Sequence, residues 1–289
     1  MTTRPVGLPA RIAALDRTVI IGVLNVTPDS FSDGGRYLDP QAAIAHGLHL
    51  HEQGADLIDV GGESTRPGAV RVPSDEECGR VLPVVTGLVA AGVPVSIDTM
   101  RSSTAEAAVE AGACLVNDVS GGLADATMYE RVAALRVPYV AMHWRGHSDH
   151  MNDLATYDDV VGDVISELTQ RVDAAVVAGM DVAAIVIDPG LGFAKESDHN
   201  WQLLRSLDQL MSLGFPVLIG ASRKRFLGGL LADGAGVPRP MEERDAATDA
   251  VTAIAAAQGV WAVRVHDVRG SKDAVRVAAA WTQGSDTHA

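Results

Sequence analysis

Short apolar segments recur along the chain, and helical patterns separate them. The segments are rich in β-branched residues and do not alternate with polar residues. Continuous apolar runs of this kind are typical of strands that are buried on both faces, and therefore of a parallel sheet. They cover residues 18–24, 55–60, 93–98, 114–118, 137–142, 183–188, 215–220 and 260–265.

Alanine-rich stretches between these segments have the spacing of amphipathic helices. In residues 158–179, apolar residues recur at every fourth position, and we expect Gly179 to end that helix. The expected apolar stripe consists of Val160, Val164, Leu168, Val172 and Val176. Eight strand signals with helical segments between them, and a last helix near 270–283, predict an α/β fold of the (β/α)8 TIM-barrel type. A doubly wound open sheet is the alternative.

The length of the chain fits a single domain. A barrel of this type takes about 250 residues, and no linker, repeat or low-complexity stretch divides the 289 residues. We therefore predict one domain over residues 1–289, with a core at about 18–283.

Charge and cysteine content exclude several classes of protein. The chain has 23 Lys and Arg residues against 37 Asp and Glu residues, a formal net charge of −14. A nucleic-acid partner is not expected, because proteins that bind nucleic acids carry a basic face. No apolar run approaches the roughly 20 residues of a membrane span, so no membrane partner is expected either. Cys78 and Cys114 lack the spacing of a metal site, and the low cysteine content favours a cytoplasmic protein.

Polar residues stand at the ends of nearly all the predicted strands. The carboxyl ends of the strands of a barrel meet at one rim, where active sites lie. Asp98, Asn117 and Asp188 offer hydrogen-bond acceptors, and the amide adds donors, as the binding of a planar heterocycle with N–H groups requires. Arg264 and His266 are two residues apart, so their side chains point the same way along the last strand. The sequence therefore predicts one polar site at this rim.

Two further features point to the same rim. The segment SRKR, residues 222–225, opens a helix directly after the seventh strand, where barrels often bind phosphate. The glycine-rich loops 25–37 and 61–73 are candidates for a lid that orders when a ligand binds. We expect Asp59 to be buried in a polar network at the rim and Glu63 to position the second loop.

Several sequence segments between residues 18 and 283 resemble the signature motifs of one enzyme family. They read GVLNVTPDSFSDGG, DVGGESTRPGA, SIDT, NDVSGG, DPGLGF, GASRKRF and RVHD. By these motifs the sequence resembles the dihydropteroate synthases, bacterial enzymes of folate biosynthesis. The resemblance implies a transferase that condenses 6-hydroxymethyl-7,8-dihydropterin pyrophosphate with p-aminobenzoate to give 7,8-dihydropteroate and pyrophosphate. It also implies Mg²⁺ as cofactor, binding of sulfonamide inhibitors, and a cytoplasmic homodimer.

The same resemblance implies roles for individual residues. The pterin would be bound by Asp98, Asn117, Met142, Asp188, Lys224 and Arg264. The p-aminobenzoate site would be formed by Phe31, Thr65, Arg66, Pro67, Phe193 and Arg225. The pyrophosphate would be held by Asn25, Arg264 and His266, with Asn25 as the metal ligand. The catalytic residues would be Asp33, Asp98, Lys224, Arg264 and His266.

The chemistry that the resemblance implies is dissociative. Pyrophosphate leaves first, and the pterin ring delocalises the cation that forms on the exocyclic carbon before the amine attacks. Arg264 and His266 would stabilise the leaving charge, Asp98 would stabilise the cation, and the two loops would exclude water. Such a reaction requires no covalent nucleophile from the protein.

Two other functions are compatible with part of this pattern. Methyltetrahydrofolate-dependent corrinoid methyltransferases resemble the sequence at its Asp and Asn strand ends, but the intact SFSDGG, STRPG and SRKR segments favour the synthase. A non-catalytic pterin-binding paralogue would have lost residues at the rim. The sequence retains Asn25, Asp98, Asn117, Asp188, Lys224, Arg264 and His266.

Overall fold

The computed structural model describes residues 3–27, 39–64, 68, 71–147 and 151–283. Each of the eight apolar segments contains a strand. The strands are β1 (Val19–Asn25), β2 (Leu57–Gly61), β3 (Val95–Asp98), β4 (Leu115–Asp118), β5 (Tyr139–Met142), β6 (Ile185–Asp188), β7 (Leu218–Ile219) and β8 (Ala262–Val265). Nearly all of their residues are buried, which explains why the segments carry no polar alternation.

The strands form one parallel sheet in the order β6-β5-β4-β3-β2-β1-β8-β7. The two ends of this sheet meet, because Ile187 forms a parallel bridge with Val217 and its N–H donates to the Pro216 carbonyl (2.9 Å). The sheet is therefore a nearly closed barrel. The predicted (β/α)8 fold is confirmed, and the open doubly wound sheet is wrong.

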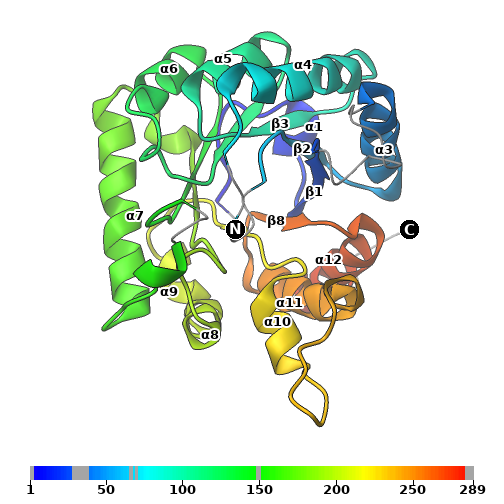
Figure 1. Cartoon of the computed structure of the whole chain (residues 1–289), viewed down its shortest axis with the longest axis vertical. Coiled ribbons are helices and arrows are strands. Elements are labelled where there is room, and N and C mark those ends of the chain that lie inside the picture. Colours follow the sequence, from blue (N-terminus) through cyan, green and yellow to red (C-terminus); the bar gives the residue numbers. More distant parts are fainter. Residues whose placement is uncertain (1–2, 28–38, 65–67, 69–70, 148–150, 284–289) are drawn as a thin grey trace.

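Helices follow the strands and surround the barrel (Figure 1). The α-helices are α1 (Ala10–Ala13), α3 (Pro40–Gln53), α4 (Ser74–Ala90), α5 (Ser102–Glu110), α6 (Met128–Leu135), α7 (Val160–Val177), α8 (Ser197–Arg205), α9 (Leu207–Met211), α10 (Arg225–Leu230), α11 (Asp245–Gln258) and α12 (Val268–Gln283). Short 3₁₀ helices lie at Met151–Leu154, Val182–Ala184 and Met241–Glu243. Among the described residues, no helix is long and apolar enough to cross a membrane.

The helix α7 shows how far the periodicity argument holds. Val160, Val164, Leu168 and Val172 are buried as expected, but Val176 is 40 % exposed. A step of four residues turns the side chain by about 40° beyond a full turn, so a stripe with this spacing winds off the core. Gly179 ends the helix at φ +101°, a left-handed conformation that glycine adopts without strain, and this prediction is confirmed.

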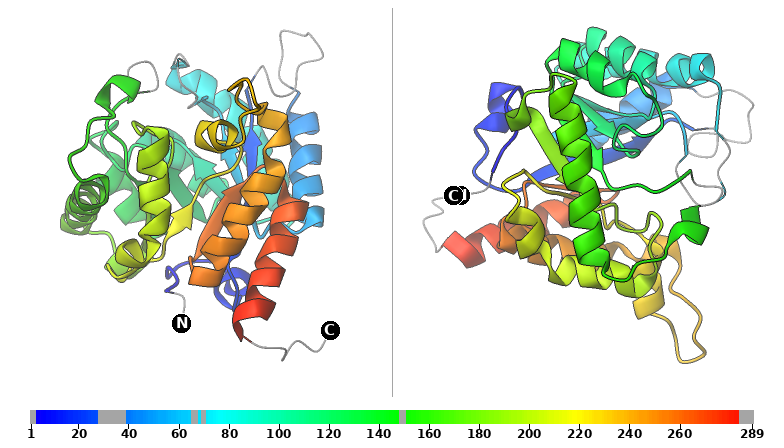
Figure 2. Two further views of the ribbon diagram at one scale, coloured as in Figure 1. Left: turned by 90° about the horizontal axis from the view of Figure 1, so that it is seen from below. Right: turned by 90° about the vertical axis from the view of Figure 1, so that its left-hand side faces the viewer.

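The two ends of the barrel have different structures. At the amino ends of the strands, Leu8 and Ile12 pack onto inward-facing residues such as Leu57, Leu115 and Trp261, so α1 closes this end. The predicted core begins near residue 18, and this plug extends it towards the amino terminus. The carboxyl ends of the strands lie at the opposite end, at the top of the left-hand view in Figure 2.

Candidate active site

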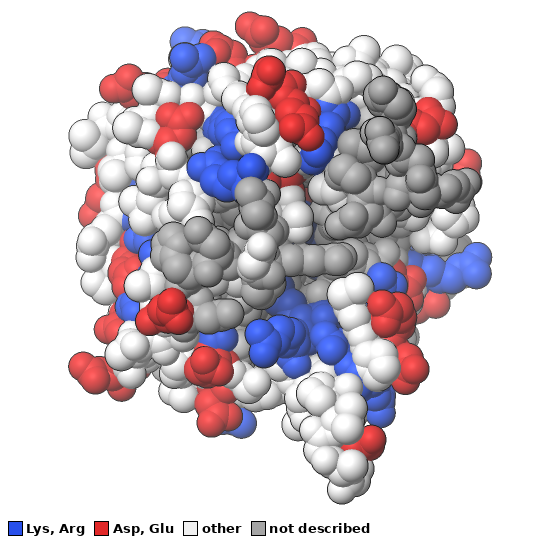
Figure 3. Space-filling model, viewed as in Figure 1, with Lys and Arg blue, Asp and Glu red and all other residues white. Residues whose placement is uncertain are grey.

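A cavity of about 570 Å³ opens at the carboxyl ends of the strands. Its lining includes the predicted site residues Asn25, Asn117, Met142, Asp188, Phe193, Lys224, Arg225, Arg264 and His266. Figure 3 shows this face, on which Lys and Arg side chains gather over the start of α10. A larger cavity of about 940 Å³ lies at the other end of the barrel, near the starts of β1, β7 and β8, and none of the predicted site residues lines it. The predicted site residues that line a cavity therefore gather at the smaller one.

Arg264 of β8 joins two carboxylates beneath this cavity. Its Nε donates to Asp59 Oδ2 (2.6 Å), and its Nη2 donates to Asp98 Oδ2 (2.6 Å). The Asn117 side-chain amide donates to the same oxygen of Asp59 (2.9 Å). Strand pairing explains the grouping, because β1, β2, β3 and β4 are neighbours and β8 pairs with β1. The expected burial of Asp59 in a polar network is confirmed, since its exposed fraction is 1 %.

The charges of this cluster are strongly coupled. Burial raises the pKa of Asp98 to about 7; Arg264 opposes the shift and the Asp59 carboxylate adds to it. Burial by itself would lower the pKa of Arg264, but Asp59 and Asp98 raise it overall. Asp98 is not among the residues that line the cavity; it contacts Arg264, which is. The cluster therefore holds a permanent cation between two buried acids.

A second pair of opposite charges, Asp188 and Lys224, lines the same cavity. Burial raises the pKa of Asp188, against the opposing effects of Lys224 and of the Gly190 N–H, which donates to Asp188 Oδ1 (2.7 Å). Burial lowers the pKa of Lys224 to about 8, with Asp188 opposing the shift and Arg264 adding to it. The Lys224 Nζ donates to the Leu191 carbonyl. Perturbed pKa values of this kind, in a cavity with a specific charge partner, are typical of functional sites.

An apolar cluster forms part of the cavity wall. Met142 packs with Met100, Val119 and Trp144, and Phe193 packs against this group. The Lys224 Nζ lies 4.9 Å from the centroid of the Phe193 ring. A cavity with apolar walls and few convergent polar groups suits a planar heterocyclic ligand.

The turn that carries Phe193 has an unusual backbone. Gly190 and Gly192 have φ values of +66° and +77°, and Ala194 has +48°. A Cβ atom at Gly190 would lie 2.1 Å from the His143 carbonyl oxygen, so this position requires glycine. The end of β5 and the turn after β6 are thus in close contact.

His266 and Asn25 lie at the mouth of the cavity. The His266 Nδ1 lies 3.0 Å from Ser222 Oγ, and Arg264 and His266 both line the cavity, as their spacing predicts. Asn25 is the last residue of β1 and contributes an amide oxygen. Among the described residues, no group of three or more His, Cys, Asp or Glu side chains could hold a metal ion.

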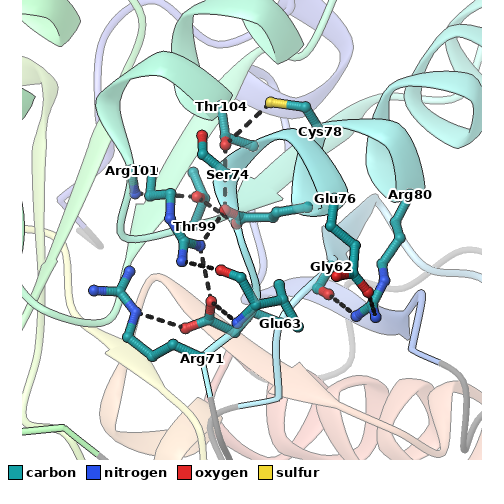
Figure 4. A network of polar contacts seen from close by, with 12 residues as sticks. Gly62, Glu63, Arg71, Ser74, Glu76, Cys78, Arg80, Thr99, Arg101 and Thr104 are labelled. Carbon is teal, nitrogen blue, oxygen red and sulfur yellow. Dashed lines mark hydrogen bonds and ion pairs between the residues drawn. The ribbon is translucent and has the colours of Figure 1, made fainter.

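A network of ion pairs anchors the second loop. Arg101 Nη1 donates to Glu63 Oε2 (2.8 Å) and to Glu77 Oε2 (2.5 Å), and a further Arg101 N–H donates to the Val72 carbonyl. Arg71 pairs with the other oxygen of Glu63 (3.2 Å). In Figure 4 the Arg101 and Arg71 side chains point toward Glu63. The expectation that Glu63 positions this loop is in keeping with its contacts.

Several predicted residues lie outside the part of the chain that the structure describes. They are Phe31, Asp33, Thr65, Arg66 and Pro67. Their roles, and the proposed closure of the two loops, stay predictions.

Two other residues that line the cavity, Lys195 and Arg244, do not stand at the end of a strand or in a segment named above. Ser222 lines the cavity as well and belongs to the predicted SRKR segment. Lys195 stands two residues after Phe193, so a reading of the whole loop after the sixth strand would include it. Glu77 and Arg101 are distant in sequence from the motifs they support.

Comparisons with known proteins agree with this geometry. The profile of the pterin-binding enzymes matches residues 21–266. The dihydropteroate synthase of Mycobacterium leprae is 54 % identical over 263 residues, which cover 91 % of this chain and 93 % of the relative. The chain belongs to the dihydropteroate synthase family. The predicted family, enzyme class and fold are therefore confirmed.

Solved structures of this family have the same fold. The dihydropteroate synthase of Xanthomonas albilineans with 4-aminobenzoic acid is 44 % identical, with a TM-score of 0.86 over 99 % of this chain and 100 % of the other. The dihydropteroate synthase of Yersinia pestis in a sulfonamide drug complex is 36 % identical, with a TM-score of 0.87 over 98 % and 100 % of the two chains. As a dihydropteroate synthase, the chain is an enzyme of folate biosynthesis.

Proposed function

We propose that the cavity at the carboxyl ends of the strands joins 6-hydroxymethyl-7,8-dihydropterin pyrophosphate to p-aminobenzoate. The observation that carries this assignment is the pairing of buried charges, Arg264 with Asp59 and Asp98 on one side and Lys224 with Asp188 on the other. A pterin presents N–H groups along one edge and a carbonyl oxygen beside them. The cavity offers acceptors and donors for both.

Asp188 and Lys224 would recognise the amide edge of the pterin. The Asp188 carboxylate would accept from the ring N–H and the exocyclic amine, and Lys224 would donate to the carbonyl oxygen. Each charge-assisted bond of this kind contributes about 1.5–3 kcal/mol. Asp98 and Asn117 would bind the remaining ring nitrogens, and Met142 would pack on the ring, in keeping with its place in the apolar wall.

The reaction breaks the bond from the exocyclic carbon to the pyrophosphate oxygen and forms a bond from that carbon to the amine nitrogen, which then loses a proton. Arg264 and His266 would stabilise the negative charge on the leaving group, and Asp98 and Asp33 would stabilise the cation on the pterin. Arg264 is held by two carboxylates, so its orientation is fixed before the substrate binds. Fixed charges of this kind need no reorganisation during the reaction.

The residues at the mouth fit a magnesium ion that arrives with the pyrophosphate. Mg²⁺ keeps several waters and is usually bound through one or two protein oxygens together with substrate phosphates. The amide oxygen of Asn25 is the ligand that we propose, and Asn25, Arg264 and His266 would hold the pyrophosphate. When bound, Mg²⁺ would neutralise charge on the leaving group.

The p-aminobenzoate site would lie between the apolar wall and the start of α10. Phe193 would contact the ring, and Arg225, exposed at the edge of the cavity, would bind the carboxylate. Phe31, Thr65, Arg66 and Pro67 would complete the site from the two loops. Sulfonamides would occupy the same position, which the sulfonamide complex of the Yersinia pestis relative supports.

Pyrophosphate release tests this function. Purified protein is mixed with Mg²⁺ and the pterin pyrophosphate, with and without p-aminobenzoate, and the pterin product is identified by mass spectrometry. We expect release that depends on p-aminobenzoate and gives 7,8-dihydropteroate. Binding of the pterin without turnover would instead support the non-catalytic paralogue.

We further propose a single-domain, cytoplasmic homodimer without a nucleic-acid or membrane partner. The helices α11 and α12 pack together and expose Ile254, Val277 and Trp281, the last at 86 %, and such a surface supports association. Cys78 and Cys114 are free thiols, as expected in a reducing compartment. Light scattering after size exclusion, with wild-type protein and Trp281→Glu, tests the dimer: a monomeric wild type would contradict it.

A further inference from the structure

A lysine that the proposed roles do not use lies in the wall of the active-site cavity. Lys195 follows Phe193 in the turn after β6 and is only 8 % exposed. Its Nζ contacts the His143 Nδ1 at 2.8 Å and donates to the Phe193 carbonyl at 3.0 Å. A buried lysine is costly unless its charge is supported, so its position requires an explanation.

A series of side-chain contacts connects Lys195, through His143, to Glu167 of α7. The His143 side chain is fully buried, and its Nε2 lies 3.1 Å from Glu167 Oε2. Arg145 donates to Glu167 Oε1 and stacks on the Tyr157 ring, with the guanidinium carbon 3.9 Å from the centroid. An ammonium group has only donors, so the His143 Nδ1 accepts from Lys195 and the imidazole proton lies on Nε2, the nitrogen that is 3.1 Å from the Glu167 carboxylate. Burial lowers the pKa of His143 to about 3, which is consistent with a neutral imidazole.

Lys195 also interacts with the charged residues of the cavity, Asp188 and Lys224. Burial lowers the pKa of Lys195 well below its usual value, and Asp188 opposes that shift. Burial raises the pKa of Asp188, and Lys195 is among the groups that oppose the rise. The charged and titratable groups around Lys195 are Asp188, Lys224, His143, Glu167, Arg145 and Tyr157. Those around Asp188 are Lys224, Lys195 and Arg264. Lys195 is therefore one of three cations that oppose the rise in the pKa of Asp188.

We propose that Lys195 is a positioning residue of the pterin site. Contacts with His143, and through it with Glu167, orient Lys195, which in turn fixes the Phe193 carbonyl and favours the ionised form of Asp188 that binds the ring. This inference rests on the proposed role of Asp188 in pterin recognition. Lys195 acts through its neighbours, so it belongs with the positioning residues and not with the catalytic ones.

The charge of Lys195 affects the pH dependence of pterin binding. Burial raises the pKa of Asp188, and the positive charge of Lys195 opposes that rise. Removing the charge raises the pKa further, so the loss of pterin affinity on acidification begins at a higher pH. If the pKa of Asp188 rises by one unit, pterin binding weakens about tenfold at a pH below the pKa values of both wild type and variant, and it changes little at a pH well above both.

The test uses a pterin without a phosphate, 6-hydroxymethylpterin, because a phosphate on the probe would titrate near pH 6. Its dissociation constant is measured by calorimetry from pH 5.5 to 7.5 for wild type, Lys195→Met and Glu167→Gln, and circular dichroism verifies that each variant is folded. Glu106→Gln is the matched control, since it breaks an ion pair with Arg131 that is exposed and away from the cavity.

We expect Lys195→Met to bind about tenfold more weakly than wild type at the acidic end and with a much smaller difference at the alkaline end. Glu167→Gln should shift the profile in the same direction by less, and Glu106→Gln should leave it unchanged. A loss of affinity that is equal at every pH would overturn the proposal, because it would show a packing role only. Unchanged binding would also overturn it.

Two remaining outcomes are decisive as well. If Lys195→Met does not fold, Glu167→Gln decides: a shifted profile supports the proposal, and an unshifted profile overturns it. If wild-type protein does not bind the pterin at all, the proposed function itself fails and this inference fails with it. Pterin binding by wild type with no change in either variant contradicts Lys195 alone.

Discussion

The ion-pair network of the second loop permits a quantitative prediction about Arg101. This side chain is 15 % exposed and donates to two carboxylates, Glu63 at 7 % exposure and Glu77 at 1 %. Arg101→Met keeps most of the side-chain volume and removes only the charge and its donors. The variant therefore leaves two buried carboxylates without their shared cation.

The expected loss of stability follows from the contacts that remain. Removing one partner of a buried ion pair costs about 3–5 kcal/mol. Glu63 keeps its contact with Arg71, and Glu77 keeps the hydroxyl of Thr99 at 2.6 Å and that of Thr104 at 3.2 Å. These contacts place the cost near the lower limit, about 3 kcal/mol. A loss of that size lowers the melting temperature by about 6–12 °C in a chain of this length.

Urea unfolding followed by circular dichroism measures this loss. The matched control is Arg131→Met, which breaks the exposed pair with Glu106 and should cost less than about 1 kcal/mol. The double variant Arg101→Met/Glu77→Gln also removes the more deeply buried of the two carboxylates that lose Arg101, so it should recover part of the stability. Equal losses for Arg101→Met and Arg131→Met would refute the reasoning, because burial would then make no difference.

Three further predictions concern the active site. The pH profile of kcat/KM should be bell-shaped with its maximum at about 7.5, since Asp98 must be ionised and its pKa is about 7, while Lys224 must be protonated and its pKa is about 8. If the decrease of kcat/KM at alkaline pH persists in Lys224→Met, the assignment to Lys224 is contradicted. Asp188→Asn should weaken pterin binding by one to two orders of magnitude, at about 1.5–3 kcal/mol for the lost charge-assisted bonds, and unchanged calorimetric affinity would remove Asp188 from the site. Arg66→Ala should raise the KM for p-aminobenzoate while pterin affinity persists, and an unchanged KM would contradict the predicted contact with p-aminobenzoate.

The strands of this fold could be predicted from the sequence because a parallel barrel buries both faces of its sheet. A strand of this kind is a short apolar run, and several of them end in a polar residue, as Ile185–Asp188 illustrates. The position of Val176 could not be predicted from a stripe with a spacing of four, since the rotation accumulates along the helix. The closure of the barrel depends on one bridge between Ile187 and Val217, and no local pattern in the sequence marks it.

The sequence predicts which residues of the candidate site stand at the rim of the barrel, but it does not predict which of them pair with one another. Each residue at a strand end is visible in the sequence, whereas the partner it takes depends on which strands are adjacent. Arg264 contacts Asp59 across 205 positions and Asp98 across 166 positions of the chain. The sequence does not mark Lys195 as part of the site, because its neighbours, His143 and Glu167, belong to other elements and come together only in the folded barrel.

The arrangement of charges explains how a chain with a formal net charge of −14 can bind an anionic substrate. Each buried acid lies near a cation: Asp59 and Asp98 pair with the half-buried Arg264, and Asp188 interacts with the half-buried Lys224 and with the buried Lys195. Burial opposes the charged form of both Asp98 and Lys224, so the cavity holds its charges against a desolvation cost. A ligand that donates to the acids and accepts from the lysine favours those charged forms. The cavity therefore gains more binding free energy from a complementary heterocycle than a solvated surface would, because its charges are disfavoured when no ligand is bound.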